Sequence, residues 1–172
     1  MRLYHFSEDP DIALFEPRTL DYRQEEPAMV WAIDEFHAPH YYFPRNCPRV
    51  CLWPEESTSE ADKERFFGHS AVQRIIAVES DWLERIRETK LYRYVFEEEG
   101  FAEYDINAGY YTSLQTVNPV AVEPIGDLLQ QLSLTGIELR ITPSLMPLRA
   151  AILESTVNFS MIRMKYAKQG GA

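Results

Sequence analysis

Short apolar runs separated by polar turns dominate the chain. In the clearest of them, Ile137-Glu138-Leu139-Arg140-Ile141, apolar and charged residues alternate, as expected for a strand with one buried face. Comparable runs predict strands over 2–6, 28–33, 48–53, 73–78, 90–97, 109–114, 118–123 and 137–141.

Helical patterns are fewer. Leu128 and Leu132 lie on one stripe of a predicted helix over 127–134, and further helices are expected over 81–88 and 145–154. A short helical turn is expected over 36–43, where Pro39 is tolerated only in the first turn. The segment after Ser155 is compatible with either a strand or a continued helix. Because strands outnumber helices and do not alternate with them regularly, the predicted fold class is α+β, with a mostly antiparallel sheet and short helices.

Length and composition indicate one folded domain. The 172 residues are 45% hydrophobic and 26% charged, which is typical of a globular chain that can bury a core. We expect a single domain over residues 1–167 and a disordered tail over residues 168–172. No apolar run approaches the roughly 20 residues that span a bilayer, and acidic residues begin at position 8, unlike in a signal peptide. A cytoplasmic location is therefore the expectation.

The charge balance limits the classes of molecule that the protein is expected to bind. With 27 acidic and 17 basic residues, the formal net charge is −10. Such a field repels nucleic acid and anionic lipid, so neither broad nucleic-acid binding nor membrane binding is expected. The charge does not specify a protein partner.

The cysteines and two of the histidines invite a metal interpretation. Cys47 and Cys51 lie on a predicted strand, where a separation of four residues spans about 13 Å, too far for a disulfide. We therefore expect two free thiols, typical of a reducing compartment. His37 and His40 share a helix face and, with one cysteine, would be candidate zinc ligands. Surface histidines and buried thiols are the simpler interpretation, and we expect no metal.

Arg45 is a candidate for ligand binding because it lies close to several aromatic residues in a proline-bounded loop. A guanidinium group beside aromatic rings suits a planar ligand that carries phosphate. The alternative is an ion pair with one of the many surface acids.

Three N-terminal segments form a recognisable pattern. A strand carries a histidine in Leu3-Tyr4-His5-Phe6-Ser7, a second strand contains Trp31, and a short helix leads to Tyr42, eleven residues after Trp31. This pattern resembles the histidine-tyrosine-glutamate branch of the ADP-ribosyltransferase superfamily. The resemblance implies a split antiparallel sheet that binds NAD or a related nucleotide in a cleft between strands 2–6 and 28–33.

The resemblance also implies roles for these residues. His5 would hydrogen-bond the adenosine ribose of NAD, Tyr42 would stack on the nicotinamide, and Trp31 would form part of the pocket wall. A core position without ligand contact is the alternative for His5 and for Tyr42.

The catalytic acid of that superfamily has no clear counterpart in this chain. Its expected position falls near Gly109, and Glu103, Asp105 and Glu123 are close in sequence without aligning. That glutamate would favour the positive charge that develops on the ribose as nicotinamide leaves. The catalytic residue is therefore unknown, and NAD-dependent transferase activity stays an open expectation.

The segments 122–129, 136–145 and 159–163 also resemble an uncharacterised bacterial family of full-length relatives. This second resemblance covers nearly the whole chain and implies no activity. The leading hypothesis is thus an ADP-ribosyltransferase-like protein that binds NAD or a related nucleotide. The alternatives are a non-catalytic binding or interaction module of the same fold and, less favoured, a metal-dependent hydrolase.

Overall fold

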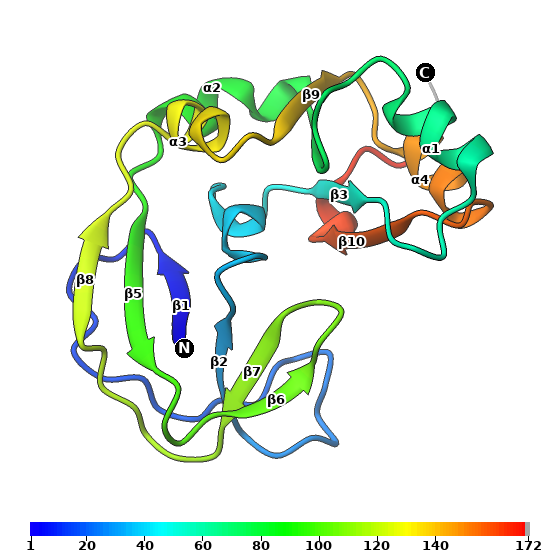
Figure 1. Cartoon of the computed structure of the whole chain (residues 1–172). Coiled ribbons are helices and arrows are strands. Elements are labelled where there is room, and N and C mark those ends of the chain that lie inside the picture. The colour runs from blue at the N-terminus through cyan, green and yellow to red at the C-terminus, as the bar shows by residue number, and fades with distance from the viewer. Residues whose placement is uncertain (171–172) are drawn as a thin grey trace. The chain divides into compact units, whose positions relative to one another are not determined.

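The chain divides into two compact units in a computed structural model that describes residues 1–170 (Figure 1). The first unit comprises Met1–Tyr42 and Lys90–Gly126, and the second comprises Phe43–Thr89 and the chain from Asp127 onward. Each unit is built around its own sheet.

The first unit contains a six-stranded sheet in the order β6-β7-β2-β1-β5-β8, with antiparallel pairing throughout. Its strands are β1 (Arg2–Ser7), β2 (Val30–Ile33), β5 (Tyr92–Glu97), β6 (Ala102–Asp105), β7 (Tyr110–Ser113) and β8 (Ala121–Pro124). A 3-10 helix, η1 (Ala38–Tyr41), follows β2 and has Pro39 in its first turn, as expected.

Successive side chains of a strand point to opposite faces, which gives this sheet two different surfaces. On the Leu3 face, Leu3 packs with a buried aromatic and aliphatic cluster. The members of that cluster are Leu3, Phe15, Val30, Ala32, Tyr94 and Phe96. On the opposite Tyr4 face, a smaller cluster contains Tyr4, Ile33, Ala38 and Val95, with half-buried Phe6, Tyr41 and Tyr110 against it.

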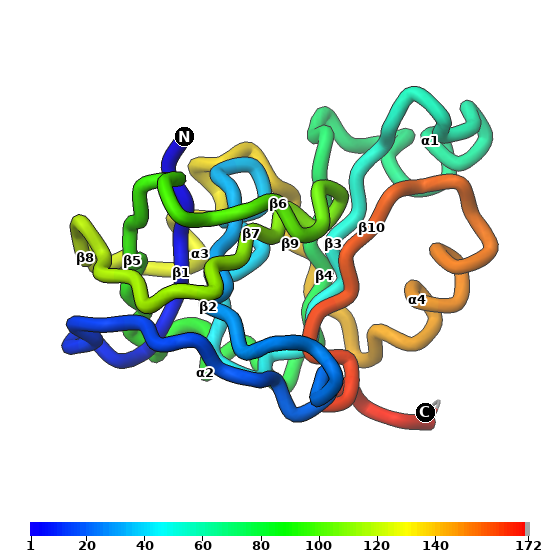
Figure 2. Tube along the Cα trace, turned by 90° about the horizontal axis from the view of Figure 1, so that it is seen from below, coloured from blue at the N-terminus to red at the C-terminus, as the bar shows by residue number. Residues whose placement is uncertain are grey.

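The segment between β1 and β2 packs on the Leu3 face and can be followed in blue in Figure 2. The Phe15 ring lies 5.1 Å from the rings of both Tyr94 and Phe96. The Tyr94 hydroxyl donates to the Asp9 carbonyl (2.6 Å) and accepts from the Ile12 amide (3.0 Å). These contacts bury one face of the sheet.

The second unit contains a four-stranded sheet in the order β10-β3-β4-β9. Its strands are β3 (Arg49–Trp53), β4 (Ile75–Glu79), β9 (Glu138–Thr142) and β10 (Asn158–Ile162). The pairs β10–β3 and β3–β4 are antiparallel, whereas β4 and β9 are parallel. The helical segments of this unit are α1 (Glu60–Phe67), η2 (Ser80–Trp82), α2 (Leu83–Glu88), α3 (Leu128–Leu134), α4 (Met146–Leu153) and η3 (Met164–Tyr166).

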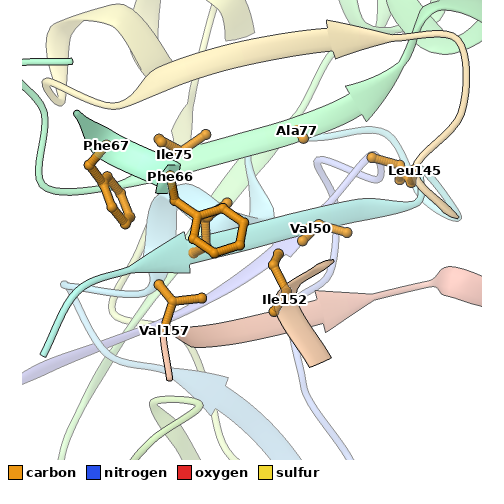
Figure 3. Packing of buried hydrophobic residues seen from close by; sticks show 9 residues of the cluster. Val50, Phe66, Phe67, Ile75, Ala77, Leu145, Ile152 and Val157 are labelled. Carbon is orange, nitrogen blue, oxygen red and sulfur yellow. The ribbon is translucent and has the colours of Figure 1, made fainter. Parts of the chain in front are cut away.

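A core cluster of the second unit combines side chains from its sheet and from helices α1 and α4, and Figure 3 shows how these side chains pack. All residues of β3 and β4 are buried, in keeping with their continuous apolar runs. Phe66 and Phe67 of α1 and Ile152 of α4 join Val50 and Ile75 of these strands in one cluster. Burying such large side chains stabilises the unit by about 1.5–3 kcal/mol per residue.

The predicted fold class is confirmed: the chain combines short helices with an antiparallel sheet and a mixed sheet. Strand β6 was not expected, and the undecided segment after Ser155 forms strand β10. At the expected tail, the Lys168 amide donates to Glu79 and its ammonium group pairs with Asp81 at 2.7 Å, whereas residues 171–172 lie outside the described part of the chain. Within residues 1–170 no helix is long and apolar enough to cross a membrane.

Candidate ligand-binding site

His5 lies on the Leu3 face of the first unit, where its ring contacts Phe15 at a centroid distance of 4.9 Å. Its Nδ1 is 3.0 Å from the carbonyl oxygen of Trp31. Because a carbonyl oxygen only accepts, Nδ1 carries the proton and donates. His5 therefore binds the backbone of β2, and its side chain points away from the Tyr4 face.

Trp31 lies on the Tyr4 face, opposite His5. Its ring is half-buried and contacts two tyrosines edge to face, Tyr110 at 5.7 Å and Tyr104 at 4.7 Å. The indole Nε1 is buried and has no hydrogen-bond acceptor among the described residues. The pleat thus places His5 and Trp31 on different faces although their strands are neighbours.

Tyr42 directly follows η1 and is 8% exposed. Its ring contacts Phe6 at 5.5 Å, and Phe6 in turn lies parallel to Tyr41 at 6.3 Å, with an interplanar angle of 13°. Phe6 follows His5 on β1, so Tyr42 and His5 are on opposite sides of the sheet. Strands β1 and β2 pair at Tyr4 and Ile33, and the cleft expected between them stays a prediction.

The rings on the Tyr4 face form a continuous chain of contacts, which we call the aromatic row. It is completed by Tyr41 and Tyr110, whose rings are 6.5 Å apart and whose hydroxyl oxygens are 2.5 Å apart. In order, the aromatic row consists of Phe6, Tyr41, Tyr110, Trp31 and Tyr104. All five residues are partly or largely exposed, which leaves a strip of aromatic surface on the sheet.

A cation lies near each end of the aromatic row. Beside Phe6 and Tyr42, the Arg93 guanidinium covers the Tyr4 ring at 5.1 Å and pairs with Glu123 through Nε at 2.9 Å. At the other end, the Arg23 guanidinium is 5.3 Å from the ring of Trp31. A planar ligand with negatively charged groups would find guanidinium groups at both ends.

The position expected for a catalytic acid has no room for a side chain. Gly109 has φ +74°, and a Cβ there would be 2.2 Å from His37 Nδ1 and 2.9 Å from Asp34 Oδ1. His37 is buried, and its Nδ1 and its amide are both 2.8 Å from Asp34 Oδ1. The Asp34–His37 pair therefore fills the space beside Gly109.

The three acids near Gly109 in sequence also have other roles. Glu123 pairs with Arg93, and Glu103 is exposed on β6. Asp105 Oδ1 accepts from the amides of Asn107 and Ala108 and so stabilises the turn into β7.

The remaining candidates belong to the metal and phosphate hypotheses. Arg45 lies in the second unit, in the turn before β3, and is exposed. Cys47 and Cys51 are free and buried, as expected, and burial raises the pKa of each thiol to about 12. The expectation of surface histidines is wrong, because His37 and His40 are both buried. Within residues 1–170 no group of three or more histidine, cysteine or acidic side chains is arranged to hold a metal ion.

Sequence reasoning missed four rings of the aromatic row and Arg23. Because side chains alternate along a strand, Phe6 could have been assigned to the face of the sheet opposite to His5, and Tyr110 to the face opposite to Tyr111. The register that brings Tyr110 beside Trp31, through the pair Ile33–Tyr110, is set by tertiary structure and has no local signal.

These features define an α+β protein with a partly exposed aromatic sheet face. The chain belongs to a family of unknown function, DUF6886, whose match covers residues 4–167. This confirms the expected membership of an uncharacterised family. No curated protein and no solved structure matches the chain. The ADP-ribosyltransferase resemblance stays a prediction.

Proposed function

We propose that the first unit binds NAD or a related nucleotide along the aromatic row, as a binding module without transferase activity. The observation that carries this proposal is the unbroken chain of partly exposed rings from Phe6 to Tyr104 on one face of the sheet. Stacking of a base on an aromatic side chain is worth about 1–3 kcal/mol. An extended row suits a dinucleotide, which carries two flat rings joined by a flexible linker.

Polar groups near both ends of the aromatic row could bind the polar parts of such a ligand. The resemblance assigns Tyr42 and Trp31 to one nicotinamide site, whereas three other rings separate them in the chain of contacts, so the proposal departs from the resemblance at this point. The buried Nε1 of Trp31 can donate to a carbonyl or phosphate oxygen of the ligand, which would offset the cost of burying this donor. At the Tyr42 end, a phosphate would have to compete with Glu123 for Arg93.

His5 acts indirectly in this proposal. Its hydrogen bond to the Trp31 carbonyl, added to the pairing of Tyr4 with Ile33, holds β2 against β1 and so positions the Trp31 ring. His5 would therefore affect ligand binding through Trp31 and without touching the ribose.

The surroundings of Gly109 favour binding without catalysis. Loss of nicotinamide creates positive charge on the ribose, which the superfamily's glutamate would stabilise. Here the space beside Gly109 is taken by His37 and Asp34. We therefore expect bound NAD to keep its nicotinamide.

Calorimetric titration with NAD tests this proposal, with a matched pair of variants. Tyr110→Ala removes a central ring of the row, whereas Tyr111→Ala removes the neighbouring ring on the Leu3 face. Circular dichroism would verify that both variants are folded. We expect Tyr110→Ala to weaken NAD binding by about tenfold or more, and Tyr111→Ala to leave it within about twofold.

Two results would contradict the proposal. The absence of heat with wild-type protein up to millimolar NAD would reject nucleotide binding. Release of free nicotinamide from NAD, measured by chromatography and abolished in Tyr110→Ala, would reject the non-catalytic part and return the transferase hypothesis.

A further inference from the structure

Aromatic rings from two parts of the first unit line the Arg23 side chain, which remains 33% exposed. Its guanidinium carbon lies 5.3 Å from the ring centre of Trp31, 5.3 Å from that of Tyr104 and 5.9 Å from that of Tyr22. Trp31 belongs to β2 and Tyr104 to β6, so two of these rings are carried by the sheet. Three rings around one charge form an aromatic cage, an arrangement that recognises organic cations.

Glu26 completes the cage with a negative charge. Its Oε1 accepts from Arg23 Nη1 at 3.0 Å and from the Tyr104 hydroxyl at 2.8 Å. The Glu26 Oε2 is buried and accepts no hydrogen bond from residues 1–170. The Trp31 Nε1 is also buried and donates no hydrogen bond to these residues. The cage thus contains a buried acceptor and a buried donor that the described chain leaves unsatisfied.

Arg23 enters the cage from a small surface loop. The backbones of Arg18 and Met29 pair through two hydrogen bonds, of 3.0 and 3.1 Å, and close the loop at its base. Inside the loop, the Arg23 amide donates to Leu20 and the Glu26 amide to Arg23. An arginine side chain has many rotamers, so Arg23 can leave the cage while the backbone of the loop stays in place.

We propose that Tyr22, Trp31, Tyr104 and Glu26 form a binding site for an organic cation of dispersed charge, such as a pyridinium or a quaternary ammonium group, and that Arg23 occupies this site as an internal competitor. A guanidinium is flat and weakly hydrated, which makes it the side chain that most resembles such a ligand. The inference goes beyond the proposed function, because it requires neither a nucleotide nor the rest of the aromatic row.

The experiment titrates tetramethylammonium and, separately, 1-methylnicotinamide into wild-type protein and into Arg23→Ala. Tryptophan fluorescence would report binding at Trp31, in a background in which Trp53 and Trp82 are replaced by phenylalanine. Arg18→Ala is the matched control, since it removes the same charge from an exposed position of the same segment. We expect Arg23→Ala to bind at least one probe about tenfold more tightly than wild type and Arg18→Ala.

A second substitution tests the cage itself. Adding Tyr104→Ala to Arg23→Ala is expected to abolish the gain in affinity. The inference is overturned if neither probe binds to Arg23→Ala, if all three proteins bind equally, or if the gain survives loss of Tyr104. If circular dichroism shows that Arg23→Ala disturbs the fold, Arg23→Met takes its place, because methionine is also a long side chain but carries no charge.

NAD titrated in parallel separates the two proposals. Binding of a probe without binding of NAD rejects the nucleotide proposal and retains the cation site.

Discussion

The Gly109→Ala substitution tests the packing that excludes a catalytic acid. Two costs add at this position. A residue with a Cβ is strained in the left-handed region by about 1–2 kcal/mol, and Gly109 has φ +74°. The new Cβ would also be 2.2 Å from Nδ1 of His37, which is only 6% exposed and held by Asp34. Overpacking of this kind costs about 1–3 kcal/mol. We therefore expect the free energy of unfolding to fall by about 2–5 kcal/mol.

Gly100→Ala is the matched control. Gly100 lies in the same unit, has φ +84° and has nothing within 4 Å of the added Cβ, so it carries the conformational cost alone. Urea unfolding monitored by circular dichroism should show a loss of about 1–2 kcal/mol for this variant. In a His37→Ala background, the cost of Gly109→Ala should fall toward that of Gly100→Ala without reaching it, because Asp34 Oδ1 would still lie 2.9 Å from the new Cβ. Equal losses for the two alanine variants in the wild-type background would refute the steric argument.

Three further predictions concern stability and reactivity. Tyr94→Phe removes the two hydrogen bonds to Asp9 and Ile12 and should lower the free energy of unfolding by about 1–3 kcal/mol. Proteolysis within residues 8–15 should become faster. An unchanged cleavage rate would show that the ring of residue 94 alone holds this segment. The hydroxyl of Ser70 and the guanidinium of Arg140 lower the pKa of Glu138. The ionised carboxylate therefore stabilises the folded chain at any pH above the ordinary glutamate pKa, about 4. This contribution to stability is lost as the pH falls through the lowered pKa of the folded state. Wild type should therefore exceed Glu138→Gln in stability at neutral pH and lose that advantage in acid, and a difference that does not change with pH would contradict the assignment. Burial raises the pKa of Cys47 and Cys51 to about 12, so a thiol reagent at about pH 8 should modify both cysteines only after unfolding. Rapid labelling of the folded protein would show that the structure around these cysteines opens.

Much of the secondary structure could be predicted because its signals are local. The apolar runs around Leu52 and Val78 predict buried strands, and both strands are buried along their whole length. Strand β6 escaped because all four of its residues, Ala102–Asp105, are exposed, so no hydrophobic periodicity marks it. Strand β10 was undecided since a short mixed run after Ser155 fits a helix or a strand equally well.

The candidate site could be predicted only in part. The sequence by itself determined that Trp31 and Tyr42 are aromatic residues next to a strand and a short helix. The expectation of an acid near Gly109 depends on the resemblance and stays a prediction. Alternation along β1 already implies that His5 and Phe6 face opposite sides. Which side carries the other rings depends on strand register, and register is decided by pairing between residues far apart in the chain.

Tertiary structure alone decided the aromatic row and the cage around Arg23. Tyr110 reaches Trp31 because β7 pairs with β2, and Tyr104 reaches it because β6 pairs with β7. The local sequence specifies the strands through hydrophobic periodicity, a short-range property. A binding surface on a sheet arises from neighbours that the chain brings together only when it folds, so its composition cannot be read along the sequence.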